Sequence, residues 1–97
     1  MALTFIARMK IHPEKEAAFI DACERMEKAV AANEPGALLY RFYRLREDNA
    51  FAVIESFADH AAEEAHQASA HFKEIAPAMI DCIDGGWERE YLDPLKA

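Results

Sequence analysis

Several signals that identify common functional classes are missing from this sequence. It has two cysteines, Cys23 and Cys82, which lie too far apart to form the CxxC motif of a redox protein. GxGxxG loops, phosphate-binding loops and nucleophile elbows are missing too. The apolar runs are shorter than the roughly 18 residues that a membrane-spanning helix needs. We therefore expect neither a dithiol oxidoreductase nor a membrane protein.

Positive charge is also scarce. The 97 residues include 11 Lys and Arg against 18 Asp and Glu, a formal net charge of −7, and the basic residues form no stripe. Nucleic acid and anionic membrane surfaces are therefore poor candidates as partners. The first residues, MALTFIARMKIHPEKE, are interrupted by Arg8 and Lys10, so we expect no signal peptide there. The two cysteines are expected to be free buried thiols, which favours a cytoplasmic protein.

Three strands are predicted in the first 58 residues from alternating or continuous apolar residues. They cover residues 2–11, 37–46 and 50–58. The short polar sequence EDN separates the second and third strands, and this spacing predicts a hairpin.

Helices are predicted where apolar residues recur at spacings of three and four. One occupies residues 12–33. Asp59 and Ser69 are candidate N-caps, and the apolar face that follows Ser69 extends to Ile83. Pro77 is expected to kink or interrupt this last helix, which DGG should end. The alternating aromatic sequence WEREYL then predicts a final strand.

The order strand, helix, strand, strand, helix, strand is that of the ferredoxin-like split βαβ fold. We expect residues 1–97 to form one α+β domain, with a four-stranded antiparallel sheet and its helices on one face. Both faces of the predicted strands are apolar; in the second strand Leu38, Tyr40 and Phe42 are expected to lie opposite Leu39 and Tyr43. Because a helix-free apolar face would stay exposed, we predict a homodimer joined through it.

His66 is the first candidate for acid–base chemistry. It lies at helical spacing from the small residues Ala62 and Ser69, which predicts that its side chain points into the crevice between helix and sheet. Imidazole is suited to proton transfer near neutral pH. The alternative is a structural histidine that is satisfied by a nearby backbone group or carboxylate.

Glu55 is the second candidate, because it interrupts an apolar strand face that includes Val53 and Phe57. A carboxylate in such a row is costly unless it is paired, hydrogen-bonded or protonated, and functional sites collect such groups. The alternative is a structural ion pair with an arginine on a neighbouring strand. The candidate arginines are Arg8, Arg41 and Arg44.

A metal site is not predicted from the histidines His60, His66 and His71. Residues five apart, such as His66 and His71, point about 140° apart around a continuous helix. A break near Ser69 could bring them together, but no standard ligand spacing is present.

Two stretches, EPGALLYRFYR and FAVIESFADHAAEEAHQASAHF, resemble the antibiotic biosynthesis monooxygenase family. Its members often have an E-P-G turn, a strand ending in E-x-[WFY]-x-D, and an alanine-rich helix with A-H and a nearby second histidine. The matching positions here are Glu34-Pro35-Gly36, Glu55, Phe57, Asp59, Ala65-His66 and His71-Phe72. The resemblance is collinear over nearly the whole chain.

This resemblance implies a dimeric α/β barrel with a pocket in each subunit between the helices and the sheet. Relatives oxygenate quinols and polycyclic phenols without metal, flavin or other cofactor. Others degrade haem or isomerise a phosphorylated sugar derivative. Haem-degrading members use an asparagine in the first strand and a pocket tryptophan, whereas this first strand has no asparagine and the tryptophan is Trp87.

We therefore predict a cofactor-independent monooxygenase that takes a small aromatic or quinol-like substrate and dioxygen. His66 would be the base or a hydrogen-bond donor to the phenolate, and Glu55 would orient His66 or hold a substrate hydroxyl. The expected substrate-binding residues are Tyr40, Phe57, His71 and Phe72. The alternatives are an isomerase or other proton-transfer enzyme that uses the same pair, and a non-catalytic dimeric ligand-binding module.

Overall fold

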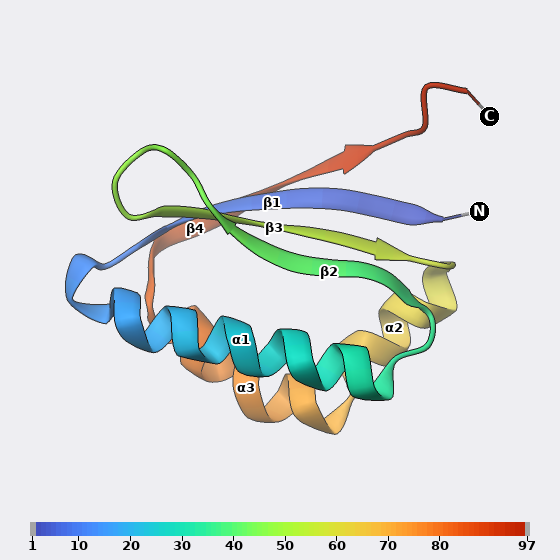
Figure 1. Cartoon of the computed structure of the whole chain (residues 1–97), viewed down its shortest axis with the longest axis horizontal. Helices are drawn as coiled ribbons and strands as arrows, with labels where there is room; N and C mark the ends of the chain where they lie inside the picture. The colour runs from blue at the N-terminus through green and yellow to red at the C-terminus, as the bar shows by residue number, and fades with distance from the viewer. Residues whose placement is uncertain (1, 97) are drawn as a thin grey trace.

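The strands and helices follow one another in the predicted order. The computed structural model describes residues 2–96. Its elements are β1 (Leu3–Ile11), the 3-10 turn η1 (Pro13–Lys15), α1 (Glu16–Asn33), β2 (Ala37–Arg44), β3 (Ala50–Phe57), α2 (His60–Ala68), α3 (Ala70–Asp81) and β4 (Ile83–Leu92). All neighbouring strands are antiparallel, in the order β2-β3-β1-β4. The helices lie on one face of this sheet (Figure 1), which confirms the ferredoxin-like α+β fold.

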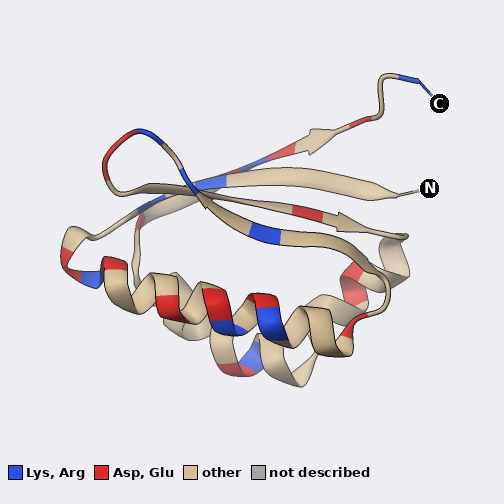
Figure 2. Ribbon diagram, viewed as in Figure 1, with Lys and Arg blue, Asp and Glu red and all other residues tan. Residues whose placement is uncertain are grey.

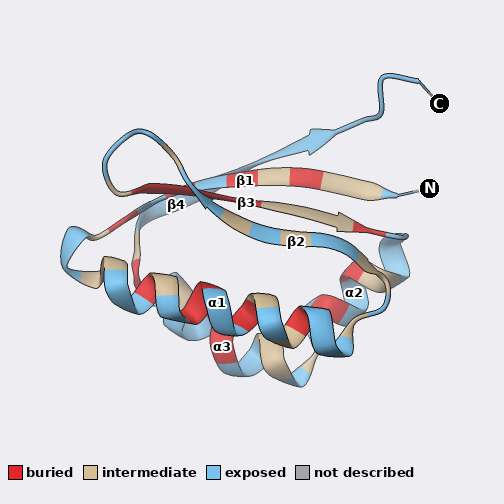
Figure 3. Cartoon of the chain, viewed as in Figure 1, coloured by how far each residue is buried: buried red, intermediate tan, exposed pale blue. Residues whose placement is uncertain are grey.

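The core lies between the sheet and α1, and between α1 and α3. Phe5 and Phe57 from the sheet are almost completely buried, as are Phe19 and Met26 from α1. Figure 3 shows the buried positions of α1 turned toward the sheet and α3. Charged residues gather on the outer side of α1 instead (Figure 2). Within residues 2–96, no helix combines the length and apolarity that crossing a membrane requires.

Leu38 is not on the predicted face. The pairing of β2 with β3 shifts register between Ala37 and Leu39, so Leu38 is an additional residue in the strand, and it is 60% exposed. Tyr40 and Phe42 do face the helices, as expected. A β-bulge breaks the two-residue period, and alternation alone gives no sign of it.

The end of the chain also differs from the prediction. Ile83 belongs to β4 rather than to the apolar face of α3, and the DGG sequence lies inside β4. Gly85 has φ of +93°, a conformation that favours glycine, and the register of β4 against β1 shifts nearby. Pro77 does not interrupt α3, which continues through it to Asp81.

A single residue, Ser69, separates α2 from α3. Its backbone is extended, its hydroxyl donates to the carbonyl of His66 at 2.6 Å, and it accepts a hydrogen bond from the amide of Phe72 at 3.2 Å. The carboxylate of Asp59 accepts from the amide of Ala62 at the start of α2. Both predicted caps are therefore confirmed, and the chain changes direction between His66 and His71.

Within residues 2–96, no helix lies on the second face of the sheet (Figure 1). Ile6 and Ile54, which pair across β1 and β3, are half-buried at its centre. Leu39 and Tyr43 on β2 are 39% and 43% exposed. Apolar side chains therefore remain exposed on the side of the sheet opposite the helices, next to charged ones such as Arg8 and Arg41.

The hydroxyl of Ser69 should contribute measurably to stability. Replacing Ser69 with Ala removes the cap of α3 and is expected to lower the free energy of unfolding by about 1 kcal/mol. Ser69→Thr keeps the hydroxyl and serves as the matched control. Urea unfolding of the three proteins measures the difference, and equal stability of Ser69→Ala and wild type would contradict the capping role.

Candidate active site

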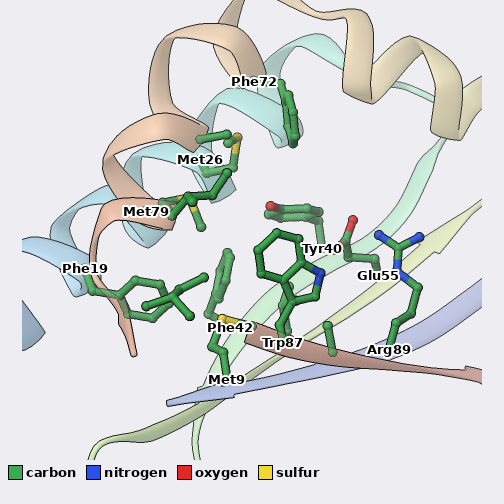
Figure 4. A pocket seen from close by; sticks show the side chains of 15 residues that line it. Met9, Phe19, Met26, Tyr40, Phe42, Glu55, Phe72, Met79, Trp87 and Arg89 are labelled. Atoms are coloured by element: carbon green, nitrogen blue, oxygen red, sulfur yellow. The ribbon is translucent and has the colours of Figure 1, made fainter. Parts of the chain in front are cut away.

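An apolar pocket of about 130 Å³ lies between the sheet and helices α1 and α3. Its polar side chains are Tyr40, Glu55 and Arg89. Figure 4 shows Glu55 and Arg89 close together at one end of the pocket. Aromatic and methionine side chains that form the rest include Phe19, Met26, Phe42, Phe72, Met79 and Trp87. This lining is suited to an aromatic group with one polar substituent, and the volume is below the roughly 300–1,000 Å³ of pockets that enclose a whole drug-sized ligand.

Glu55 faces this pocket from β3, between Val53 and Phe57 on the helix-covered side of the sheet. Its side chain is 12% exposed. Burial raises its pKa to about 7, against the opposing effect of Arg89 and with a smaller contribution from the negative charges of Glu63 and Glu34. A carboxyl group with this pKa can accept or donate a proton near neutral pH.

The arginines considered from the sequence do not pair with Glu55. Arg8 binds Glu90 at 3.0 Å, and Arg44 binds Glu16 at 2.9 Å. Arg41 lies over the ring of Tyr43. The interpretation of Glu55 as part of a cross-strand pair with one of these three arginines is therefore wrong.

Arg89 is the basic residue that sequence reasoning missed. It lines the pocket from β4, and its guanidinium carbon lies 4.1 Å from the centre of the Phe5 ring. It also approaches Glu63 at 3.4 Å. Trp87, Arg89 and Tyr91 pair with residues on the helix-covered side of β1. The alternation of WEREYL could therefore have indicated that Arg89 faces the helices.

His66 lies behind Glu55 rather than in the pocket wall. It is 3% exposed, and its ring centre lies 5.0–5.4 Å from those of Tyr40, Phe57 and Phe72. Its Nε2 is 4.0 Å from Oε1 of Glu55. His66 therefore lies in the predicted crevice between helix and sheet. Glu55 lines the pocket and His66 does not.

The four expected substrate-binding residues divide between three locations. Tyr40 and Phe72 line the pocket, whereas Phe57 is fully buried beside His66. His71 lines a separate surface groove near Gly36. Burial, together with the charge of Glu55, raises the pKa of the Tyr40 hydroxyl well above its ordinary value, so this hydroxyl stays protonated and can donate a hydrogen bond.

Glu34 connects the two histidines, and the residue-based reasoning did not assign it a role. Its Oε2 is hydrogen-bonded to Nδ1 of His66 at 2.8 Å and to Nε2 of His71. Its side chain is 9% exposed, and within the described residues its Oε1 is buried without a hydrogen-bond partner. In the sequence, the E-P-G motif was the feature that could have pointed to Glu34.

Glu34, His66 and His71 are also chemically capable of holding a metal ion. Their ligand atoms lie within 4.8 Å of one another. Ligands around a tetrahedral zinc ion lie about 3.3 Å apart, given bonds of about 2.0–2.1 Å. The 2.8 Å contact of His66 with Glu34 is instead a direct hydrogen bond. Glu34, His66 and His71 thus form a hydrogen-bonded network, and Oε1 of Glu55 lies beside it, 4.0 Å from Nε2 of His66.

The buried carboxyl of Glu55 should make stability depend on pH. Its pKa of about 7 lies above the unfolded value of 4.5, so the folded protein keeps a proton that the unfolded chain releases between these values. The contribution of Glu55 to stability therefore falls as pH rises through this window, by roughly 3 kcal/mol in total. Glu55→Gln does not ionise and should gain about that much relative to wild type between pH 4.5 and 8.

Urea unfolding of wild type and Glu55→Gln at several pH values measures this gain. Glu64→Gln, on the exposed side of α2, is the matched control and should keep a constant difference from wild type. A pH-independent difference for Glu55→Gln would show that Glu55 ionises as freely in the folded protein as in the unfolded chain.

Comparisons with known proteins identify the family of this chain. The sequence model of the antibiotic biosynthesis monooxygenase family matches residues 2–78. YcnE of Bacillus subtilis (strain 168), provisionally assigned as a monooxygenase, is 30% identical over 84 residues, which cover 79% of this chain and 88% of YcnE.

Solved structures extend the similarity over the whole fold. A protein of Caulobacter crescentus CB15, provisionally assigned as an antibiotic biosynthesis monooxygenase, is 31% identical with a TM-score of 0.91, covering 98% of this chain and 91% of that one. SnoaB, a cofactor-independent oxygenase from Streptomyces nogalater, is 25% identical with a TM-score of 0.78, covering 99% and 95%. Since sequence and structure agree over most of its length, this chain belongs to the antibiotic biosynthesis monooxygenase family.

Proposed function

We propose that this protein is a cofactor-independent monooxygenase that oxidises a quinol or a polycyclic phenol. The observation that carries the proposal is one titratable carboxyl, Glu55, facing an otherwise mainly apolar pocket. A phenol needs only a base to become a phenolate, which can pass an electron to dioxygen directly. The similarity to SnoaB, described as a cofactor-independent oxygenase, supports the same reaction class.

The proposed reaction balances without a further reductant. Loss of the phenolic proton gives a phenolate, which transfers one electron to dioxygen and forms a radical pair. The pair combines at a ring carbon that carries hydrogen and gives a peroxide anion, which takes back the proton that the base removed. The resulting hydroperoxide loses water, made from the ring hydrogen and the outer OH, to leave a second carbonyl. Phenol and dioxygen thus give quinone and water, and the substrate supplies all the electrons.

In this proposal Glu55 accepts the phenolic proton and passes it toward Nε2 of His66. Arg89, which carries the positive charge of the pocket lining, would stabilise the phenolate oxygen. Tyr40 and Phe72 would hold the aromatic rings. Phe57 would act by packing against His66, since it does not reach the pocket.

The same pair also supports a second candidate function. The 4.0 Å separation of His66 Nε2 and Glu55 Oε1 would serve an isomerase that moves a proton between two carbons of a small metabolite. Such an enzyme needs no dioxygen. A non-catalytic binding module would retain ligand and release it unchanged.

An oxygen electrode tests the proposal with a panel of reduced naphthoquinones and anthrone-type phenols. Wild type should consume dioxygen faster than spontaneous oxidation and should incorporate label from ¹⁸O₂ into the product. Glu55→Gln should lower kcat/KM by roughly 10²–10⁴-fold, because it removes the base. Glu64→Gln, exposed on α2 and outside the pocket, is the matched control.

Turnover that persists without dioxygen would favour the isomerase. Saturable binding without conversion in either atmosphere would favour the binding module. Unchanged oxygen consumption in Glu55→Gln would exclude Glu55 as the base.

We also propose that two copies pack through the helix-free sheet faces. The exposed Leu39 and Tyr43 and the half-buried Ile54 support this, because they would otherwise be left in water on a face that they share with charged residues such as Arg41. The buried free thiols of Cys23 and Cys82 support a reducing compartment, and we propose the cytoplasm.

Lysines in this surface should prevent dimer formation. The double variant Leu39→Lys/Tyr43→Lys introduces two like charges at the proposed interface and is expected to be monomeric at micromolar concentration. Leu95→Lys, at a 99% exposed position outside the sheet, should remain dimeric. Light scattering after size exclusion measures the masses, and a monomeric wild type would contradict the proposed dimer.

A further inference from the structure

The ring of His66 has two nitrogens with different surroundings. Nδ1 lies 2.8 Å from Oε2 of Glu34, and Nε2 faces Oε1 of Glu55 at 4.0 Å. Tyr40 from β2, Phe57 from β3 and Phe72 from α3 surround the ring, so the fold fixes which nitrogen faces which carboxyl group.

Glu34 is placed to decide which of these nitrogens carries the proton. An ionised carboxylate oxygen accepts hydrogen bonds and donates none. Oε2 contacts two imidazole rings at once, and a single proton on that oxygen could be donated to only one of them. Both contacts are satisfied together when Oε2 is unprotonated and Nδ1 of His66 and Nε2 of His71 each donate.

We propose that Glu34 is a positioning residue that holds His66 in the tautomer with its proton on Nδ1. The unprotonated Nε2 then faces Glu55 and can take a proton from the pocket side. The carboxylate of Glu34 would also stabilise the imidazolium that forms, as the aspartate does in a Ser-His-Asp triad. The catalytic consequence rests on the proposed function, whereas the tautomer itself does not.

A close approach of two backbone segments brings Glu34 within hydrogen-bonding distance of His66 and His71. The amide of Ala58 donates to the carbonyl of Gly36 at 2.8 Å. A Cβ atom at Gly36 would lie 2.7 Å from Cβ of Ala62, closer than real side chains approach. Glycine at position 36 therefore lets the loop after α1 lie against α2, with Glu34 beneath His66 and His71.

Nitrogen NMR of the imidazole rings tests the tautomer directly. In wild type, Nδ1 of His66 should carry the proton and Nε2 should not. In Glu34→Gln, the side-chain amide can donate to Nδ1, so the proton should move to Nε2. His60, whose side chain is 82% exposed, provides an internal reference in the same spectrum.

Kinetics of the same variants test what the tautomer does. Glu34→Gln should lower kcat by roughly 10²–10⁴-fold with little change in KM, since the effect is on the base and not on the pocket. Glu34→Asp retains a carboxylate and should recover part of the activity and the wild-type tautomer. His71→Gln leaves Glu34 in place and should also keep the Nδ1 proton on His66.

The loop supplies a second test that leaves Glu34 itself unchanged. Gly36→Ala should displace the loop and weaken the preference for the Nδ1 proton. Adding Ala62→Gly removes the atom that would collide, so the double variant should return to the wild-type tautomer. This pair keeps the proposal testable if Glu34→Gln fails to fold.

A wild-type His66 with its proton on Nε2, or a Glu34→Gln variant that keeps the Nδ1 proton, would overturn the proposal. If the tautomer of His66 changes in Glu34→Gln but turnover does not fall, the positioning role of Glu34 stands. The role of His66 in the proposed reaction is then contradicted. The two proposals therefore fail by different measurements.

Discussion

The hydrogen bonds to one carboxylate oxygen, Oε2 of Glu34, hold three segments of the chain together. Two imidazoles from different helices meet on it, His66 from α2 and His71 from α3. A buried carboxylate is costly without such partners, so the loop after α1 and both helices are constrained together. The break at Ser69 makes this possible, because on a continuous helix the two rings would diverge by about 140°.

The sheet supplies the other half of the site. Alternation along β3 places Glu55 on the helix-covered side, among Val53 and Phe57, where burial favours its protonated form. His66 then lies between two carboxyl groups with different surroundings. Glu55 faces an apolar pocket, whereas Glu34 and His71 line a surface groove on the opposite side. The network therefore crosses the layer between α2 and the sheet.

Local rules were sufficient for much of this fold. The caps at Asp59 and Ser69 and the crevice position of His66 follow from residue types and helical spacing. The bulge at Leu38 does not, since one inserted residue leaves the composition of a strand unchanged. The role of Glu34 could not be read from spacing either. Its partners lie 32 and 37 residues away, and only packing brings them together.

The raised pKa of Glu55 bears directly on the proposed chemistry. A phenol ionises near pH 10, as a tyrosine side chain does, so an ordinary glutamate would take its proton at a cost of roughly 8 kcal/mol. With a pKa of about 7, Glu55 reduces that cost to roughly 4 kcal/mol. A bound substrate that displaces water would favour neutral Glu55 further, while Arg89 would stabilise the phenolate. Burial of this carboxyl group thus weakens the fold above neutral pH and strengthens the base.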